Sequence, residues 1–388
     1  MKKSFKLGLL PKILIAIVLG IVCSTFFPEF LTRAFVTING IFGNFLTFVI
    51  PLIILGLVAP GIAELGKGAG KLLGITALIA YLSTLISGFF SYFTCRWSYP
   101  MVLDRDPSFG QGSALDALSI EPYMSIDMPP LMDVTTSLIL SFILGLGLAV
   151  INGTYFKSVL IEFRDLVTKL ISNAIIPFLP LYIFGIFLKM GVEGQVASVL
   201  QVFIKVIAII FVMHVLLLLF QFCIAGAVSR KNPIKALITM LPAYMTALGT
   251  QSSAATIPVT LEQAKKNGVN HDIAGFVIPL CATVHLAGSI LKIVACAYAI
   301  IWMLGLPGDF SLFAGFICML GITMVAAPGV PGGAIMAALG LLASMLGFDE
   351  NTQGLMIALY IAMDSFGTAC NVTGDGAIAL IVDKIYKK

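Results

Sequence analysis

Long runs of apolar residues, separated by short polar segments, fill most of this chain. In the first part of the sequence, several of these runs have about the length that a helix needs to cross a bilayer. They lie near residues 12–28, 42–63, 72–95, 134–152, 166–190 and 199–228. The pattern predicts a membrane-spanning helix at each of them.

The apolar pattern changes in the second half of the chain. Residues 233–265 contain a small polar centre, Thr246 to Thr256, that is too polar to face lipid. Residues 311–348 are apolar but are interrupted by Pro328-Gly329-Val330-Pro331-Gly332-Gly333. Non-helical backbone at membrane depth is stable only where protein or a water-filled cavity surrounds it. Each segment is therefore predicted to enter and leave the membrane on one side, as a hairpin.

Two further apolar segments are predicted as long spanning helices. The first is 272–305, with His285 in its middle, and the second is 353–383, which carries two acidic residues. If the interrupted segments were ordinary single spans instead, the chain would end on the same side but the helix at 272–305 would be inverted.

Composition agrees with a membrane protein. Hydrophobic residues make up 59% of the 388 residues and charged residues only 11%, whereas a soluble domain carries about 25% charged residues. The net charge of +4 is spread over short clusters, so no nucleic-acid partner is predicted. The seven cysteines are scattered without metal-ligand spacing and are interpreted as small apolar fillers. No nucleotide-binding loop, metal cluster or nucleophile triad indicates a cofactor or an enzyme.

Basic residues predict the orientation, because cytoplasmic loops are enriched in Lys and Arg. With the N-terminus inside, the outer side holds only Arg33, Arg96, Arg105 and Lys189. The inner side holds Lys2, Lys3, Lys6, Lys12, Lys67, Lys71, Lys157, Arg164, Lys169, Arg230, Lys231, Lys235, Lys265, Lys266, Lys384, Lys387 and Lys388. We therefore expect a multi-pass protein of the cytoplasmic (inner) membrane with both termini in the cytoplasm.

Polar residues form a stripe on the last helix. Asp364, Thr368, Asn371 and Asp375 are spaced i, i+4, i+7 and i+11, so they share one helical face. A carboxylate in hydrocarbon costs at least about 2.5–3.5 kcal/mol, and therefore needs a partner. A bound cation or the ammonium of a substrate would supply it. The alternative is a structural pair satisfied by neighbouring helices.

Both interrupted segments offer backbone groups to a ligand. The run Thr250-Gln251-Ser252-Ser253-Ala254-Ala255-Thr256 exposes hydroxyl and peptide groups, and helix ends aimed at the middle of the bilayer bind ions. Taken singly, the first run is typical of a loop and the Pro328–Gly333 run of a kinked helix. A pair of interrupted helices is, however, a sequence indication of a transporter binding site.

These motifs resemble those of the glutamate-transporter family, the dicarboxylate/amino acid:cation symporters. A serine-rich tip followed by T-x-P-V-T reads Ser252-Ser253-Ala254-Ala255-Thr256-Ile257-Pro258-Val259-Thr260. The second hairpin motif, G-V-P-G, reads Gly329-Val330-Pro331-Gly332. The last-helix motif, D-x-x-R-T-x-x-N-V-x-G-D, reads Asp364-Ser365-Phe366-Gly367-Thr368-Ala369-Cys370-Asn371-Val372-Thr373-Gly374-Asp375. The order of elements fits over essentially the whole chain.

The resemblance implies an all-α membrane protein with eight transmembrane helices and two re-entrant hairpins, assembled as a homotrimer with an elevator mechanism. Residues 1–71 would form scaffold helices 1 and 2, and residues 72–95 helix 3 of the transport domain. Residues 96–190 would form an external loop and scaffold helices 4 and 5. Residues 191–388 would form the rest of the transport domain.

The resemblance also implies site residues. Asp364 would bind the substrate amino group, while Asn371, Thr368 and the backbone of Ser253 would hold its carboxylate. Neighbouring substrate-site positions are Gln251, Ser252, Val330, Gly332 and Gly367. Asp375 would bind a sodium ion with carbonyl groups near Cys281, His285 and Asn371. Thr283 would lie near a second sodium site, and Tyr81 and Thr84 near a third.

Two departures from the family pattern concern the substrate and the coupling ion. Gly367 replaces the arginine that grips a side-chain carboxylate, and neither Gln251 nor Ser365 restores it. This change favours a neutral amino acid as the substrate. A dicarboxylate substrate is the alternative, because Lys292 could supply the positive charge that Gly367 lacks.

The second departure is that N-M-D-G-T reads His285-Leu286-Ala287-Gly288-Ser289, so that a sodium-binding carboxylate is missing. His285, Ser289 and Lys292 are predicted to form a stripe on one helix. Either His285 is a satisfied core residue and Lys292 pairs with another helix's carboxylate, or one of these cations replaces a sodium ion or adds proton coupling.

The function predicted is a secondary symporter that imports a small neutral amino acid, coupled to Na⁺ or H⁺. The alternatives are a Na⁺- or H⁺-coupled dicarboxylate transporter and, in another class, an ion channel or the permease subunit of an importer. Neither a pore-lining repeat nor a cytoplasmic coupling helix is evident.

Overall fold

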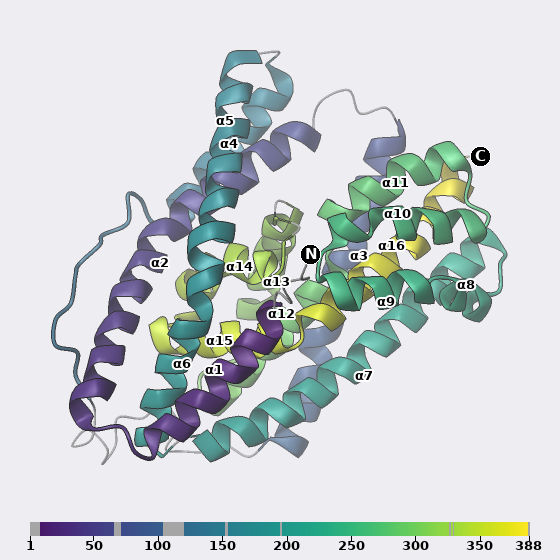
Figure 1. Ribbon diagram of the computed structural model, residues 1–388. Helices are drawn as coiled ribbons and strands as arrows, with labels where there is room; N and C mark the ends of the chain where they lie inside the picture. Colours follow the sequence, from purple (N-terminus) through teal and green to yellow (C-terminus); the bar gives the residue numbers. More distant parts are fainter. Residues whose placement is uncertain are drawn as a thin grey trace, which may run out of the picture.

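A computed structural model describes residues 8–65, 71–103, 120–151, 154–194, 196–325, 327–328 and 330–386. The regular structure of these residues is helical throughout (Figure 1). The first half comprises α1 (Leu9–Ser24), α2 (Glu29–Leu65), α3 (Lys71–Val102), α4 (Val134–Val150), α5 (Thr154–Leu170), a π-helical turn (Ile171–Ile175), α6 (Ile176–Val192) and α7 (Val196–Ser229).

The predicted span at 166–190 begins too late. The π-helical turn joins α5 to α6, so one helical segment runs from Thr154 to Val192. Hydropathy alone excluded α5 because it carries charged residues such as Arg164 and Asp165 beside the buried Leu160 and Val167. The apolar face of α5 packs against α2.

The second half comprises α8 (Pro233–Thr239), α9 (Leu241–Thr250), α10 (Ser253–Lys266), α11 (His271–Val284), α12 (Ala287–Met303), α13 (Phe310–Val325), α14 (Gly333–Leu346), α15 (Glu350–Ala362) and α16 (Asp364–Tyr386). Both predicted interruptions are present. The first lies between α9 and α10, at Gln251 and Ser252, and the second between α13 and α14. Gly329 lies outside the described residues.

Two predicted continuous helices are wrong in their middle. The segment 272–305 is unwound at His285 and Leu286, where Leu286 has φ −115° and ψ 44°. Helices α11 and α12 together are still long and apolar enough to form one membrane span, His271–Met303. The segment 353–383 breaks at Met363, and α15 and α16 meet there at a bend of 59°. His285 therefore ends α11 rather than sharing one helical stripe with Ser289 and Lys292.

Within the described residues, length and composition identify five helical segments able to cross a membrane, or six if α15 and α16 count as one span. They are Glu29–Ala63, Lys71–Val102, Thr154–Val192, Val199–Ser229 and His271–Met303. Every residue of α12 except Trp302 is buried, so α12 lies in the centre of the molecule. Helix α11 has one buried face and one exposed face that carries Phe276.

Helix packing divides the molecule into two groups (Figure 1). In one group α2 packs on α4 and α5, and α1 packs on α6. In the other, α3 packs on α12, and α16 packs on α7, α9 and α11. Helices α14 and α15 connect the groups, because α14 also contacts α2 and α15 also contacts α1 and α6.

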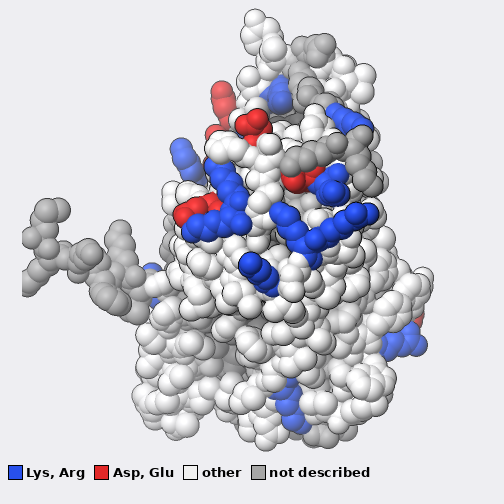
Figure 2. All heavy atoms as spheres, turned by 90° about the vertical axis from the view of Figure 1, so that its right-hand side faces the viewer, with Lys and Arg blue, Asp and Glu red and all other residues white. Residues whose placement is uncertain are grey.

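Charged residues gather at one end of the surface shown in Figure 2, above a large uncharged area. The helix ends on this side of Figure 1 belong to α8, α10 and α16. They and the end of α7 carry Arg230, Lys231, Lys235, Lys265, Lys266 and Lys384. A boundary of this kind is typical of a protein whose uncharged belt lies in lipid.

Candidate functional site

The site is built around Asp364, the first residue of α16, immediately after the break at Met363. The residue is only 4% exposed. One carboxylate oxygen lies 3.0 Å from Lys292 Nζ on α12. The other accepts a hydrogen bond of 2.8 Å from the backbone N–H of Gly332, which precedes α14. Asp364 thus connects α12, α14 and α16.

Lys292 is fully buried, and its ammonium contacts a carboxylate of another helix, as in the first of the two alternatives that the sequence left open. Its ammonium also lies 3.4 Å from the carbonyl oxygen of Met363 and 3.4 Å from the centre of the Tyr360 ring. A Cβ atom added to Gly367 would lie 2.8 Å from Lys292 Nζ. Lys292 therefore occupies the space into which a side chain at position 367 would extend.

Asn371 connects α16 to the unwound centre of α11 and α12. Its side-chain oxygen accepts hydrogen bonds from the backbone N–H groups of Gly288 (2.7 Å) and Ser289 (3.2 Å). Its amide nitrogen donates to the Ser289 hydroxyl at 2.9 Å. These bonds satisfy donors that the start of a helix leaves without a partner, which explains how α12 can begin inside the protein.

A second polar cluster surrounds Asp375, which is 1% exposed. Its carboxylate lies 2.9 Å from Nδ1 of His285. The other ring nitrogen of His285 lies 3.0 Å from the Ser83 hydroxyl and 3.3 Å from the Gln221 side-chain nitrogen. The His285 backbone N–H donates to the Cys281 carbonyl at 2.8 Å. The predicted residues Asp375, His285 and Cys281 therefore lie together.

Sequence reasoning missed Ser83 and Gln221, as well as His214, which lies 3.1 Å from the Gly288 carbonyl oxygen. A signal existed for all three. His214 and Gln221 lie seven residues apart, on one face of the largely apolar α7, and both are buried. Ser83 lies on a polar face of α3 with Thr76, Ser87 and Ser91, at spacings of seven and four residues.

Three other predicted ion-site residues make no described contact with this cluster: Thr283, Tyr81 and Thr84. Thr283 is exposed, and its hydroxyl donates to the Leu280 carbonyl. The Thr84 hydroxyl donates to the Ala80 carbonyl of its own helix. The Tyr81 ring lies beside Gly321 of α13.

The first interruption has a defined cap. Gln251 ends α9 in the left-handed region with φ 53°, and the Ser252 side chain accepts a hydrogen bond from the Ala255 backbone N–H that caps α10. Gly332 has φ 74° at the start of α14, a conformation that glycine adopts without strain.

A small cavity of about 30 Å³ lies between the two tips and α16. It brings together predicted substrate residues from both interruptions and from α16: Gln251, Ser253, Val330, Asp364, Thr368 and Asn371. Ser289 and Tyr360, which were not predicted, also line it. Ser252, Gly332 and Gly367 are not in its lining, although Gly332 bonds to Asp364 and Gly367 adjoins Lys292.

The contact between α12 and α16 requires a glycine at position 288. A Cβ atom there would lie 2.7 Å from the Gly367 carbonyl oxygen and 2.7 Å from Cys370 Cβ. We expect Gly288→Ala to lower stability by about 1–3 kcal/mol through overpacking, and to reduce transport because Asn371 and Gly367 must shift. Thermal unfolding of the purified protein and an uptake assay measure the two effects.

The matched control is Gly275→Ala on α11, where an added Cβ has no neighbour within 4 Å. We expect this variant to unfold at the wild-type temperature or slightly above it, because alanine favours a helix over glycine. Equal behaviour of the two variants would show that the α12–α16 contact is not as close as described.

Comparison with known proteins gives one consistent result. The sequence profile of the sodium:dicarboxylate symporter family matches residues 9–385. A serine/threonine transporter from Acinetobacter baylyi, SstT, is 26% identical over 98% of this chain and 98% of the relative. The SstT protein from Acinetobacter baumannii strain ATCC 17978 is 27% identical over 97% of each chain. This chain is therefore a member of the sodium:dicarboxylate symporter family, an integral membrane transporter and not an enzyme.

Proposed function

We propose that this protein is a secondary symporter that imports a small neutral amino acid of the serine and threonine class, with Na⁺ as the coupling ion. The relatives over nearly the whole chain are named serine/threonine transporters, and the family is named for sodium symport. The main structural support for this substrate class is the charge balance of the small cavity.

Among the described residues that line this cavity, Asp364 alone is charged. Lys292 neutralises it at 3.0 Å, so the cavity as a whole has no net charge. A zwitterion with an uncharged side chain suits such a site, whereas a second carboxylate would require an additional cation. In this proposal Asp364 receives the substrate ammonium, and Thr368, Asn371 and the Ser253 backbone receive its carboxylate.

A cavity of about 30 Å³ holds little more than a water molecule. Entry of an amino acid therefore requires the tips at Ser253 and Val330 to move apart, as lids do in many binding sites. Asp375 lies about one helical turn beyond Asn371 on α16. We propose that the coupling ion binds there, beside the Asp375–His285 pair. His285 holds one carboxylate oxygen, which leaves the other for the ion.

A dicarboxylate transporter is the second candidate, because Lys292 Nζ lies 2.8 Å from the Cβ position of residue 367, where the family arginine would begin. In that case Lys292 would leave Asp364 and bind the side-chain carboxylate of the substrate. The two candidates differ in which amino acid competes best.

The division into scaffold and transport units, the homotrimer, the elevator motion, and eight spans with two re-entrant hairpins belong to this proposal. So do the inner membrane and the cytoplasmic termini. What supports the division is that α1, α2, α4, α5 and α6 pack on one another, while α3 packs with the elements after α7. What supports the orientation is the gathering of Lys and Arg at one end (Figure 2).

Uptake into vesicles that contain only the purified protein tests the function. We expect radiolabelled serine to accumulate above its equilibrium level when Na⁺ is higher outside, and accumulation to collapse with a sodium ionophore. Unlabelled threonine and serine should compete, and aspartate should not. Stronger competition by aspartate would establish the dicarboxylate reading, and flux that never exceeds equilibrium would indicate a channel.

A further inference from the structure

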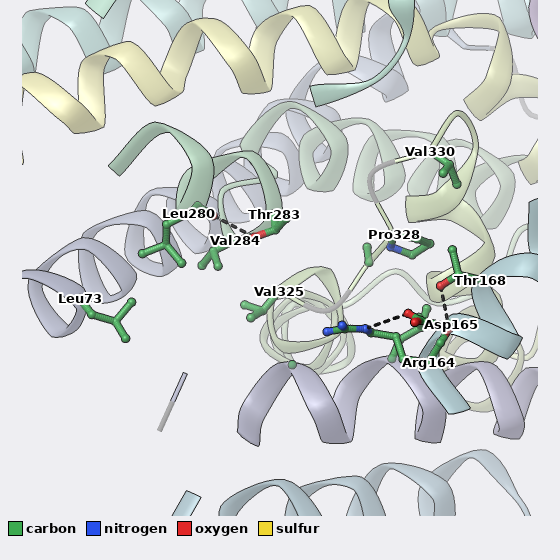
Figure 3. Close-up of a pocket in the computed structure, with 13 residues that line it drawn as sticks. Leu73, Arg164, Asp165, Thr168, Leu280, Thr283, Val284, Val325, Pro328 and Val330 are labelled. Atoms are coloured by element: carbon green, nitrogen blue, oxygen red, sulfur yellow. Dashed lines mark hydrogen bonds and ion pairs between the residues drawn. The ribbon is translucent and has the colours of Figure 1, made fainter. Parts of the chain in front are cut away.

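A cavity of about 390 Å³ lies beside the small one, between the two groups of helices (Figure 3). This volume is within the range of small-molecule sites. Its walls come from α2, α3, α5, α11, the end of α13 and the described residues Ala327, Pro328 and Val330. The proposed binding residues Asp364, Thr368 and Asn371 do not line it.

The two cavities share a wall. Ala327, Pro328 and Val330 line both of them, so the segment between α13 and α14 separates the large cavity from the Asp364 site. Gly332 holds this segment in place through its 2.8 Å hydrogen bond to Asp364.

The large cavity carries one charge of each sign. Among its described lining residues only Arg164 and Asp165 are charged, and both lie on α5 facing the segment with Pro328 and Val330 (Figure 3). Arg164 Nε lies 3.8 Å from an Asp165 oxygen, and the two side chains are 30% and 66% exposed. An exposed pair of this kind adds little to stability.

We propose that this cavity is a second, weaker binding site for the transported zwitterion, occupied between the Asp364 site and the cytoplasm. Arg164 receives the carboxylate of the amino acid, and Asp165 receives its ammonium. The positive-inside rule places α5, with Lys157 and Lys169, on the cytoplasmic side. The inference rests on the proposed function, since it takes the transported molecule to be an amino acid.

A cysteine reporter in the cavity tests the second site directly. Thr168, which lines the cavity on α5, is replaced by cysteine, and its labelling by a small neutral maleimide is followed by peptide mass spectrometry. The Asp364→Asn/Lys292→Met double substitution removes binding at the first site without leaving one buried charge alone. We expect serine to slow labelling several-fold, with half-protection at about 1–20 mM, typical of a weak site.

Both charges of the ligand should matter. Serinamide lacks the carboxylate and N-acetylserine lacks the ammonium, so each should protect at least about tenfold less effectively than serine. Adding Arg164→Gln and Asp165→Asn should abolish protection, whereas Lys169→Gln, an exposed residue of the same helix outside the cavity, should preserve it. If the double substitution prevents folding, the same protection is measured at Thr283→Cys, on another wall of the cavity, with the Asp364 site intact.

Absence of protection, or protection that persists after Arg164 and Asp165 are neutralised, would overturn the second site. That result is separate from the function itself. Serine uptake by the wild-type protein with no protection in the cavity rejects only this inference, while failure of wild-type uptake rejects the proposed function.

Discussion

Lys292→Met is expected to destabilise the protein by about 3–5 kcal/mol and to abolish transport. Lys292 is fully buried and is paired at 3.0 Å with Asp364, which is itself 4% exposed. Removing one member of a buried ion pair leaves the other charge without compensation, and that charge cannot reach water. The measurement is thermal unfolding of the purified protein in detergent, followed by serine uptake in vesicles.

The double variant Lys292→Met/Asp364→Asn separates stability from function. Because no isolated charge remains, we expect it to recover most of the lost stability while remaining inactive, since the substrate ammonium has lost its partner. Lys205→Met is the matched control, because Lys205 is also a lysine within an apolar helix but is only partly buried. A single Lys292→Met variant as stable as Lys205→Met would contradict the buried pair.

Asp375→Asn is expected to lower sodium-driven uptake at least about 100-fold while reducing stability much less than Lys292→Met. An asparagine oxygen still accepts the hydrogen bond that His285 makes to Asp375 at 2.9 Å, so the fold keeps its contact. The negative charge that a bound cation needs is lost, however, and a buried cation without a counter-charge is costly. Uptake measured over a range of Na⁺ concentrations shows this loss.

The control for this prediction lies on the same helix. Asp383 is also a buried carboxylate, at the far end of α16, and accepts the Asn270 backbone N–H at 3.1 Å. Asp383→Asn should retain sodium-dependent uptake, because that carboxylate lies outside both polar clusters. Sodium-dependent uptake that survived Asp375→Asn would show that the coupling ion does not bind to the Asp375 carboxylate.

The general architecture was predictable from the sequence because the bilayer imposes simple rules. Spans follow from apolar length, and the interruptions follow from Pro328 to Gly333 and from the polar run around Ser252. The four-residue stripe on α16 follows from helical periodicity, and all its members are buried. These features depend on local sequence alone.

The unpredicted features depend on contacts between distant segments. No proline or glycine occurs at His285, Leu286 or Met363, so nothing local indicates a break there. The break at Leu286 is stabilised by Asn371, which is more than 80 residues away in the chain. The contacts of His285 with Ser83 and Gln221 likewise require the packed arrangement of α3, α7 and α11.

The pairing of Lys292 with Asp364 has a consequence for the whole transport cycle. In the elevator motion proposed above, the binding site crosses the membrane once loaded and once empty. An uncompensated carboxylate in the empty site would then have to pass through a low-dielectric layer, which is costly. Here the countercharge is part of the polypeptide and lies 3.0 Å away. The return of the empty site can therefore be electroneutral at Asp364 without a cytoplasmic cation bound there.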